Sequence, residues 1–138
     1  MQKDISYLPL LFHSIQKKIS ESHETIMASS NLTRRHIPFI MVIKKYENGI
    51  TQQELSEYMH MDKAHTSRTL KDLEEKGYVE KVGNNTYKNK YLLSQQGEDI
   101  FKTIKDANQQ ILNRVLGILT EEELQTFEKI IRKLIQEL

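Results

Sequence analysis

A segment near the middle of the chain carries the side chains with the clearest chemical purpose. A capping residue at its start and Gly77 after its end predict a helix over 63–76. Thr66, Leu70 and Leu73 share one face of this helix and are expected to pack inward. The exposed positions near its start are Lys63, Ala64, His65, Ser67, Arg68 and Lys71. Donors on short and long side chains beside a small residue are what a helix needs to contact base edges in a major groove.

Each charged side chain of this helix has an expected contact and an alternative. Arg68 can give two hydrogen bonds to guanine, and its alternative is a salt bridge to Asp72, four residues on. Lys63 and Lys71 are expected to bind phosphate or, failing that, to remain solvated. His65 either enters the groove or is a surface histidine. The segment therefore predicts a DNA-recognition helix.

Small and amide side chains add further expected contacts. Ala64 permits close approach of the helix or touches a thymine methyl group, and Ser67 is expected to contact bases. Gln52 and Gln53 begin the preceding predicted helix, where they either touch the DNA backbone or form a solvated first turn. Together the two helices form a helix-turn-helix.

The pattern after Gly77 changes from helical to alternating and predicts a β-hairpin over 78–93. Its tip offers amide, hydroxyl and ammonium donors and no carboxylate, so it can lie along a minor groove without repulsion. The tip residues expected to contact DNA are Asn84, Asn85, Tyr87 and Lys88. Lys90 either binds phosphate or protects a sheet edge from pairing. The hairpin is the expected wing of a winged helix-turn-helix.

The sequence offers no group suited to catalysis. It has no Gly-rich phosphate loop, no GxSxG or HExxH motif and no cysteine. The three glutamates at 121–123 are better explained by a favourable helix-dipole interaction. Two groupings could bring histidines near a metal, one across the 60–65 turn and one over residues 23–36. We predict a protein that is not an enzyme and has no cofactor or metal site, with a metal-responsive regulator as an alternative.

Apolar spacing and capping residues elsewhere in the sequence predict the helices that surround these residues. Apolar spacing predicts one long helix over 5–29 and a second helix capped by Thr33, which Pro38 would kink or delay. Further helices are expected to begin after Thr51, Ser94 and Thr120. The predicted fold is mainly α with a small β-hairpin wing, flanked by N- and C-terminal dimerisation helices.

The apolar stripes of the terminal helices predict assembly. They are too long to bury inside a 138-residue monomer, and left exposed they would form an unusually large apolar patch. A two-fold homodimer would bury them and place two recognition helices about 34 Å apart, which is one turn of DNA. We expect one domain over 1–138, with a DNA-binding lobe at 33–93 and a dimerisation lobe formed by 1–30 and 94–138.

The composition and the length of the apolar runs indicate where in the cell the protein is expected. With 38% hydrophobic and 28% charged residues the chain is expected to fold rather than remain disordered. Its longest apolar run, 37–43, is far shorter than the ~20 residues of a membrane span, and Asp4 argues against a signal peptide. Six basic and eight acidic residues in 94–138 suit a lobe that faces away from DNA. We expect a cytoplasmic protein with no membrane partner.

The order and spacing of these motifs resemble those of the MarR family of bacterial transcriptional regulators. The similar segments are Leu32-Thr-Arg-Arg-His36, Thr51-Gln-Gln-Glu-Leu-Ser-Glu57, residues 62–79 and Leu93-Ser94-x-x-Gly97. The resemblance implies a homodimer with interleaved first, fifth and sixth helices, which binds a pseudo-palindromic double-stranded DNA operator. It also implies that a small, often phenolic effector between the two lobes relieves repression. The candidate residues for this effector pocket are His13, His36 and Phe39.

Two positions depart from the family pattern. The wing tip of the family usually carries Asp-x-Arg, and the matching residues here are Asn85 and Tyr87, so phosphate contact alone is the alternative to groove insertion. His36 stands where the family usually has Gln, and its alternative role is a hydrogen-bonded histidine at a helix junction. An adaptor for protein partners, built on the same winged-helix dimer, is the alternative function from another class.

Overall fold

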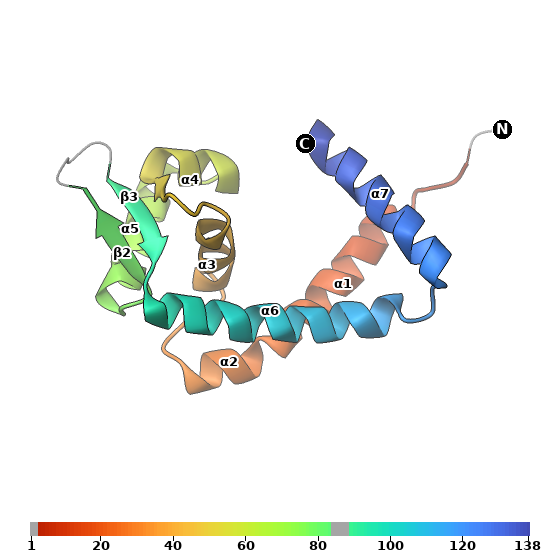
Figure 1. The fold of residues 1–138 in the computed structure, drawn as a ribbon, viewed down its shortest axis with the longest axis horizontal. Coiled ribbons are helices and arrows are strands. Elements are labelled where there is room, and N and C mark those ends of the chain that lie inside the picture. The colour runs from red at the N-terminus through yellow and green to blue at the C-terminus, as the bar shows by residue number, and fades with distance from the viewer. Residues whose placement is uncertain (1–2, 84–88) are drawn as a thin grey trace. The chain divides into compact units, whose positions relative to one another are not determined.

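The computed structural model describes residues 3–83 and 89–138, which form helices and one small sheet (Figure 1). In chain order the elements are α1 (Leu8–Ser22), α2 (Glu24–Ser29), α3 (His36–Lys44), β1 (Ile50–Thr51), α4 (Gln52–Met59), α5 (Lys63–Glu75), β2 (Val79–Val82), β3 (Lys90–Leu93), α6 (Gln95–Leu116) and α7 (Glu121–Glu137). The predicted fold class, mainly α with a β-hairpin wing, is confirmed.

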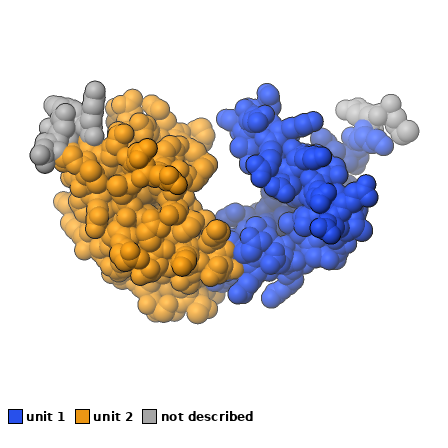
Figure 2. Space-filling view, in the orientation of Figure 1, with its two compact units in different colours: residues 1–22, 107–138 blue, residues 23–106 orange. Residues whose placement is uncertain are grey.

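The chain divides into two compact units (Figure 2). Unit 1 comprises residues 1–22 and 107–138, and unit 2 comprises residues 23–106. Unit 2 contains the helix-turn-helix and the hairpin, together with α2 and the first half of α6. Its bounds are wider than those of the expected 33–93 lobe, because Ile26 and Ile104 are buried with it.

The sheet of unit 2 has the strand order β1-β3-β2, and all its pairs are antiparallel. In the hairpin Val79 lies opposite Leu93 and Val82 opposite Lys90, as expected for the wing. β1 pairs Ile50 with Tyr91 on the other side of β3. β1 could not be predicted from the sequence, because two residues are too few to leave an alternating pattern.

The core of unit 2 fixes the orientation of α5. Phe39 and Ile40 of α3, Leu73 of α5 and Ile104 of α6 are all 0% exposed, and Leu70 is 1% exposed. Burying side chains of this size contributes about 1.5–3 kcal/mol each. Because the inner face of α5 is anchored in this way, its opposite face must lie at the surface.

Local capping fixes where α4 and α5 begin. The Thr51 hydroxyl accepts a hydrogen bond from Glu54 N, and the Glu54 carboxylate accepts one from Thr51 N, both at 3.2 Å. This is the predicted capping box, and it is confirmed. His60 ends α4 with a left-handed φ of 53°, and the Asp62 carboxylate then accepts from His65 N at 2.7 Å. The turn between the two helices is thereby defined.

The prediction of one helix over 5–29 is wrong. α1 ends at Ser22 and α2 begins at Glu24, with His23 in a turn between them. The Ser22 hydroxyl donates to Ile19 O at 2.6 Å, an interaction that competes with the backbone hydrogen bonds of a continuous helix. His23 itself is buried, so tertiary packing overrides the local apolar periodicity.

The prediction that Thr33 caps the next helix is also wrong. α3 begins at His36, and its preceding residue Arg35 provides no side-chain cap. Pro38 is then the third residue of the helix, within the first turn, where a backbone N–H is not needed. The helix therefore starts later than Thr33 would place it, which is one of the two outcomes expected from Pro38.

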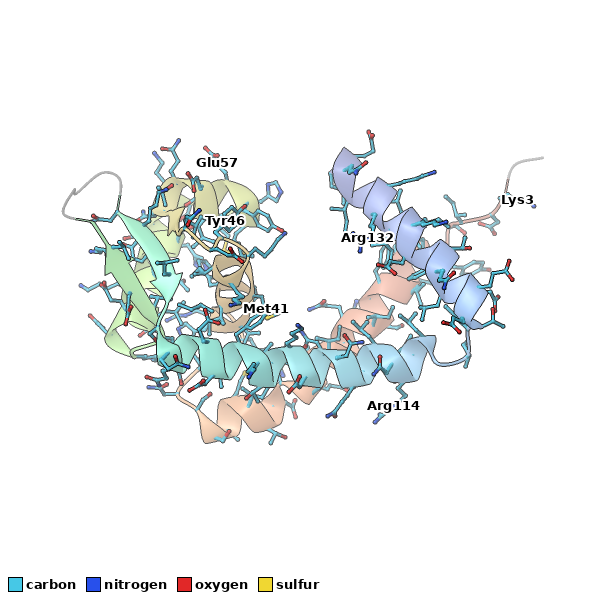
Figure 3. The ribbon with its side chains drawn as sticks, viewed as in Figure 1. Lys3, Met41, Tyr46, Glu57, Arg114 and Arg132 are labelled. Atoms are coloured by element: carbon cyan, nitrogen blue, oxygen red, sulfur yellow. The ribbon has the colours of Figure 1, made fainter. Side chains whose placement is uncertain are left out.

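Unit 1 is built from helices whose apolar side chains remain accessible. Neither α1 nor α7, both of which the structure describes in full, contains a buried residue. The predicted capping box at Thr120 is confirmed and starts α7. Arg114 of α6 and Arg132 of α7 are exposed, and Arg132 pairs with Glu128 at 2.7 Å (Figure 3).

Gly97 in the first turn of α6 allows the helix to lie directly against the backbone of Tyr78. A Cβ atom at Gly97 would lie 2.1 Å from Tyr78 O and 3.1 Å from Leu93 Cβ. We expect Gly97→Ala to lower the free energy of unfolding by about 2 kcal/mol, although alanine favours helix by about 1 kcal/mol. Urea denaturation measures this, with Thr103→Ala on the exposed side of α6 as control. An unchanged or raised stability of Gly97→Ala would contradict the packing described.

Candidate nucleic-acid interface

The surface face of α5 presents the side chains that the sequence singled out. Lys63, Ala64, Ser67, Arg68 and Lys71 are all exposed. The opposite face is buried, as predicted, at Thr66, Leu70 and Leu73, and Thr69 is buried with them. The structure thus brings one arginine, two lysines and a hydroxyl onto one side of a helix that is firmly anchored on the other.

Arg68 forms no salt bridge to Asp72. The Asp72 carboxylate accepts instead from His36 Nε2 at 2.5 Å, from Arg35 at 3.2 Å and from Lys76 at 3.2 Å. Among the residues described, Arg68 has neither a hydrogen-bond partner nor an ion-pair partner. Its five N–H donors are therefore available to an external acceptor.

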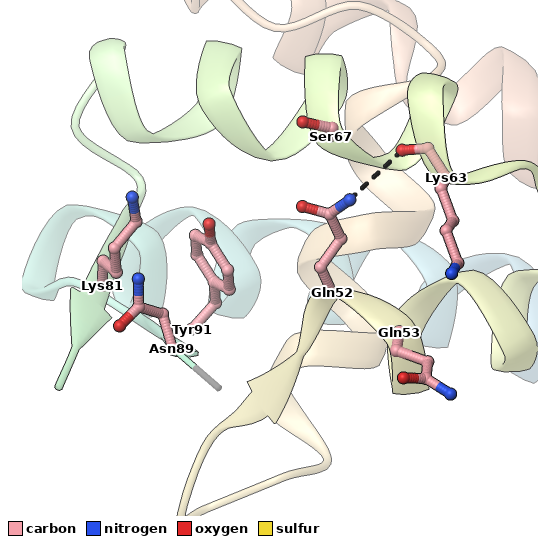
Figure 4. A pocket seen from close by; sticks show the side chains of 7 residues that line it. All are labelled: Gln52, Gln53, Lys63, Ser67, Lys81, Asn89 and Tyr91. Atoms are coloured by element: carbon pink, nitrogen blue, oxygen red, sulfur yellow. Dashed lines mark hydrogen bonds between the residues drawn. The ribbon is translucent and has the colours of Figure 1, made fainter. Parts of the chain in front are cut away.

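A hollow of ≈ 450 Å³ lies between α4, the start of α5 and the hairpin (Figure 4). Its lining residues are Gln52, Gln53, Lys63, Ser67, Lys81, Asn89 and Tyr91. None of them is acidic, and two are lysines, so the hollow suits a phosphate group. Gln52 Nε2 donates to Lys63 O at 3.3 Å, which joins the start of α4 to the start of α5 (Figure 4).

Three of these residues were missed from the sequence: Lys81, Asn89 and Tyr91. They lie on or beside the two strands of the hairpin, and Lys81 Nζ lies 5.9 Å from the centre of the Tyr91 ring. The absence of acidic residues over 81–93 was the available signal. This signal does not distinguish Lys81 from the other lysines, because packing decides which face of each strand lies toward α4. Lys90, a predicted phosphate contact, is exposed but does not line the hollow.

His65 is less exposed than the other residues of α5 that are predicted to contact bases. It is only half exposed, and its ring centre lies 6.3 Å from that of the buried Phe39, at an interplanar angle of 53°. Its Nε2 atom is buried and has no hydrogen-bond partner among the described residues. One face of the His65 ring thus packs against the core. A contact between His65 and a base stays a prediction.

The chain is similar to known proteins over the helix-turn-helix and beyond it. The model of the MarR family matches residues 30–86, which hold the whole helix-turn-helix. The HTH-type transcriptional regulator BilQ of Clostridioides difficile is 29% identical over 108 residues, which are 75% of this chain and 72% of BilQ. The crystal structure of MarR is 28% identical and superimposes with a TM-score of 0.80 over 99% of this chain and 93% of that one.

Residues 30–86 match the MarR family. The chain is similar over most of its length to transcriptional regulators, not to enzymes. A MarR family transcriptional regulator from Listeria monocytogenes, solved in complex with 26mer DNA, shares the fold with a TM-score of 0.76 at 19% identity, over 99% of this chain and 89% of that one.

Four predicted DNA contacts lie outside the described residues. They are Asn84, Asn85, Tyr87 and Lys88, the tip of the hairpin. The strands that lead to the tip are described, and they end at Val82 on one side and begin at Lys90 on the other. Minor-groove contact by the tip accordingly stays a prediction.

The three candidate effector residues are not gathered into one described pocket. His13 is exposed on α1 in unit 1, whereas His36 and Phe39 are 0% exposed in the core of unit 2. Both ring nitrogens of His36 are hydrogen-bonded, Nε2 to Asp72 and Nδ1 to the backbone N–H of Thr33 at 2.9 Å. This arrangement is the helix-junction histidine that was the alternative interpretation.

The hydrogen bonds of His36 fix its protonation state. Because Nδ1 accepts from Thr33 N, the proton of the neutral ring lies on Nε2 and points at Asp72. Burial lowers the pKa of His36 below its usual value, although Asp72 acts in the opposite direction. For Asp72, burial raises the pKa, but the hydrogen bonds from His36, Lys76 and Arg35 outweigh it and lower the pKa overall.

Acid should weaken the fold through His36. The unfolded chain takes up a proton at this residue near pH 6.5, whereas the folded chain does so only at lower pH. The free energy of unfolding should therefore fall as the pH drops below about 6.5. His36→Gln should flatten this part of the profile in urea denaturation between about pH 7.5 and 4.5, while His13→Gln should follow the wild type. The same slope in His36→Gln as in the wild type would contradict this assignment.

Within residues 3–83 and 89–138, no three His, Asp or Glu side chains are close enough together to hold a metal ion. No helix in the part of the chain that the structure describes is long and apolar enough to cross a bilayer.

Proposed function

We propose that this regulator is a cytoplasmic repressor that binds a pseudo-palindromic operator as a homodimer and is released by a small aromatic effector. The observation that carries the proposal is the exposed face of α5. On this face Arg68 is unpaired among the described residues, and Lys63 and Ser67 line a hollow without acidic groups. A face of this kind is matched to the base edges and phosphates of a major groove.

Binding would proceed from general to specific contacts. Lys63 and Lys71, with Lys81 in the hollow, would neutralise phosphates and release counterions, which supplies affinity for any DNA sequence. Arg68 and Ser67 would then select bases. The remaining proposed contacts are Gln52, Gln53, Ala64, His65, Asn84, Asn85, Tyr87 and Lys88. The Listeria monocytogenes structure with 26mer DNA supports DNA as the ligand of this fold.

The exposed apolar residues of unit 1 support the homodimer. Large hydrophobic side chains that are 38–104% exposed lie along α1, its preceding segment, α7 and the α6–α7 turn. They are Ile5, Tyr7, Leu8, Leu10, Leu11, Phe12, Ile118, Leu124, Ile130, Ile131, Leu134, Ile135 and Leu138. Monomers rarely expose apolar surface on this scale, and a second copy supplies matching helices by two-fold symmetry. The dimer would present two α5 helices to two half-sites.

The effector would act by changing how the two α5 helices engage the operator. A ligand that binds better to a form unable to contact both half-sites shifts the population toward that form. His13, His36 and Phe39 remain our candidate residues for such a ligand, although His36 and Phe39 would have to become accessible.

Selection from a random pool of double-stranded DNA tests the proposed operator. We expect the recovered sequences to contain two inverted half-sites whose centres lie about 10 base pairs, or a multiple of this, apart. Recovery of a single, non-symmetric half-site would contradict the homodimer, and recovery of no preferred sequence would contradict sequence-specific repression.

Lys71 offers a test of the proposed phosphate contacts. We expect Lys71→Ala to weaken binding to operator and scrambled DNA to the same degree, because phosphate carries no sequence information. The slope of log K against log salt should fall in magnitude by about 0.9 per subunit. Fluorescence anisotropy at several salt concentrations measures both, and Lys129→Ala on α7 is the matched control. A loss confined to the operator would show that Lys71 contacts bases instead.

A further inference from the structure

Asp72 is the acidic residue best placed to neutralise Arg68. Both residues are on α5, four positions apart, which is the spacing at which side chains on a helix meet. Arg132 and Glu128 show in α7 that this chain forms such i,i+4 pairs, with Nη2–Oε1 at 2.7 Å. Yet Arg68 remains unpaired among the described residues, because the Asp72 carboxylate is turned to other partners.

We propose that His36 is a positioning residue that holds the Asp72 carboxylate against α3 and so leaves Arg68 free to bind DNA. This inference rests on the proposed contact between Arg68 and the operator. His36 touches no DNA itself in this account, since its side chain is 1% exposed.

The geometry around Asp72 distinguishes His36 from the other two partners. His36 Nε2 lies 2.5 Å from Asp72 Oδ2, whereas Arg35 and Lys76 each make contacts at 3.2 Å. Arg35 has a side chain that is 53% exposed, so its ion pair is weakened by solvent. Lys76 binds Oδ1 and leaves Oδ2 to the other two. The shortest and least exposed hydrogen bond therefore directs Oδ2 toward α3.

His36 is suited to this task because it is itself held in place. The backbone N–H of Thr33 donates to Nδ1 at 2.9 Å, and the Thr33 hydroxyl lies 3.1 Å from the same atom. These contacts set the ring orientation and leave the proton on Nε2, where it faces Asp72. A neutral donor in the core also avoids the cost of burying a second charge.

Release of Asp72 would act on DNA binding through Arg68. A carboxylate beside the guanidinium would occupy the pair of N–H groups that guanine requires and would cancel the charge that attracts phosphate. His36 thereby contributes to sequence preference from inside the core.

The test uses His36→Phe, which removes the donor while filling the space, and His36→Gln, which keeps an N–H donor. We expect His36→Phe to lower the preference for operator over scrambled DNA about tenfold, within the range for loss of one bidentate base contact, and His36→Gln to stay within about threefold of the wild type. Adding Asp72→Asn to His36→Phe should restore the preference, because the carboxylate that captures Arg68 is gone. No restoration in the double variant would overturn the proposal.

A measurement without DNA separates this proposal from the proposed function. Nitrogen-detected NMR of arginine side chains reports whether Arg68 is paired, and the Arg132 signal supplies the reference for an ion pair in this chain. We expect the Arg68 signal to change toward a paired state in His36→Phe and to return in the double variant. An unchanged Arg68 signal in His36→Phe would overturn the positioning role, whatever the DNA result. Failure of the wild type to prefer any operator would instead contradict the proposed function alone.

Asp72→Asn by itself keeps the proposal testable if His36→Phe does not fold. An asparagine oxygen can still accept from His36 Nε2, and it carries no charge to capture Arg68. We expect this variant to keep the wild-type operator preference. A tenfold loss in Asp72→Asn would show that the carboxylate is needed for recognition, which contradicts a role limited to keeping it away from Arg68.

Discussion

Arg68→Ala is expected to remove most of the preference for operator over scrambled DNA. A bidentate contact to guanine contributes about 1–3 kcal/mol to discrimination, which corresponds to a loss of about 5- to 150-fold. The structure supports an effect of this size because Arg68 is exposed on an anchored helix and, among the residues described, spends none of its donors within the protein. Its removal should leave the fold intact, since the Arg68 side chain is exposed and has no hydrogen-bond or ion-pair partner among the residues described.

Competition anisotropy with operator and scrambled duplexes measures this preference directly. Arg114→Ala is the matched control, because it removes an exposed arginine from α6 in unit 1 (Figure 3). Urea denaturation of both variants should give wild-type stability within about 0.5 kcal/mol. An Arg68→Ala protein that still prefers the operator as strongly as the wild type would refute base recognition by this residue.

Leu134→Glu in α7 is expected to convert the protein to a monomer and to lower operator affinity by about 100-fold or more. Leu134 is 52% exposed in the single chain and belongs to the apolar stripe of α7. A carboxylate placed in an interface that excludes water has no partner there and disfavours association strongly. The monomer would contact one half-site and about half of the phosphates, which accounts for the lost affinity.

Analytical ultracentrifugation and anisotropy on the same samples test this prediction. Lys129→Glu adds a carboxylate to α7 at a position outside the apolar stripe and should remain dimeric, and Leu134→Met should behave as the wild type. A Leu134→Glu protein that stays dimeric would show that the stripe of α7 is not in the interface. A wild type that is monomeric in solution would contradict the homodimer altogether.

Local signals explain which features could be predicted from the sequence. The capping residues Thr51, Asp62 and Thr120 act within three residues of themselves, so their helices begin where the sequence indicates. The inner and outer faces of α5 follow from helical periodicity, and burial confirms them.

Features set by contacts between distant segments could not be predicted. His36 and Asp72 are 36 residues apart, and nothing in either neighbourhood indicates that they meet. His23 is buried where α1 ends, and the apolar periodicity over 5–29 does not indicate this. Likewise Tyr91 lines the hollow together with Gln52 of α4 and Ser67 of α5, which are far from it in the sequence.

The central claim is that α5 and the hairpin recognise a specific DNA sequence, and one titration tests it most directly. Fluorescence anisotropy of the wild-type protein on labelled DNA from the region upstream of its own gene, against a scrambled duplex at two salt concentrations, gives both affinity and specificity. We expect tight binding to the native duplex, a steep salt dependence and a preference for that duplex that Arg68→Ala loses. Equal and weak binding to the native and scrambled duplexes would contradict sequence-specific recognition, provided that sequences recovered from a random pool also bind no better than the scrambled duplex.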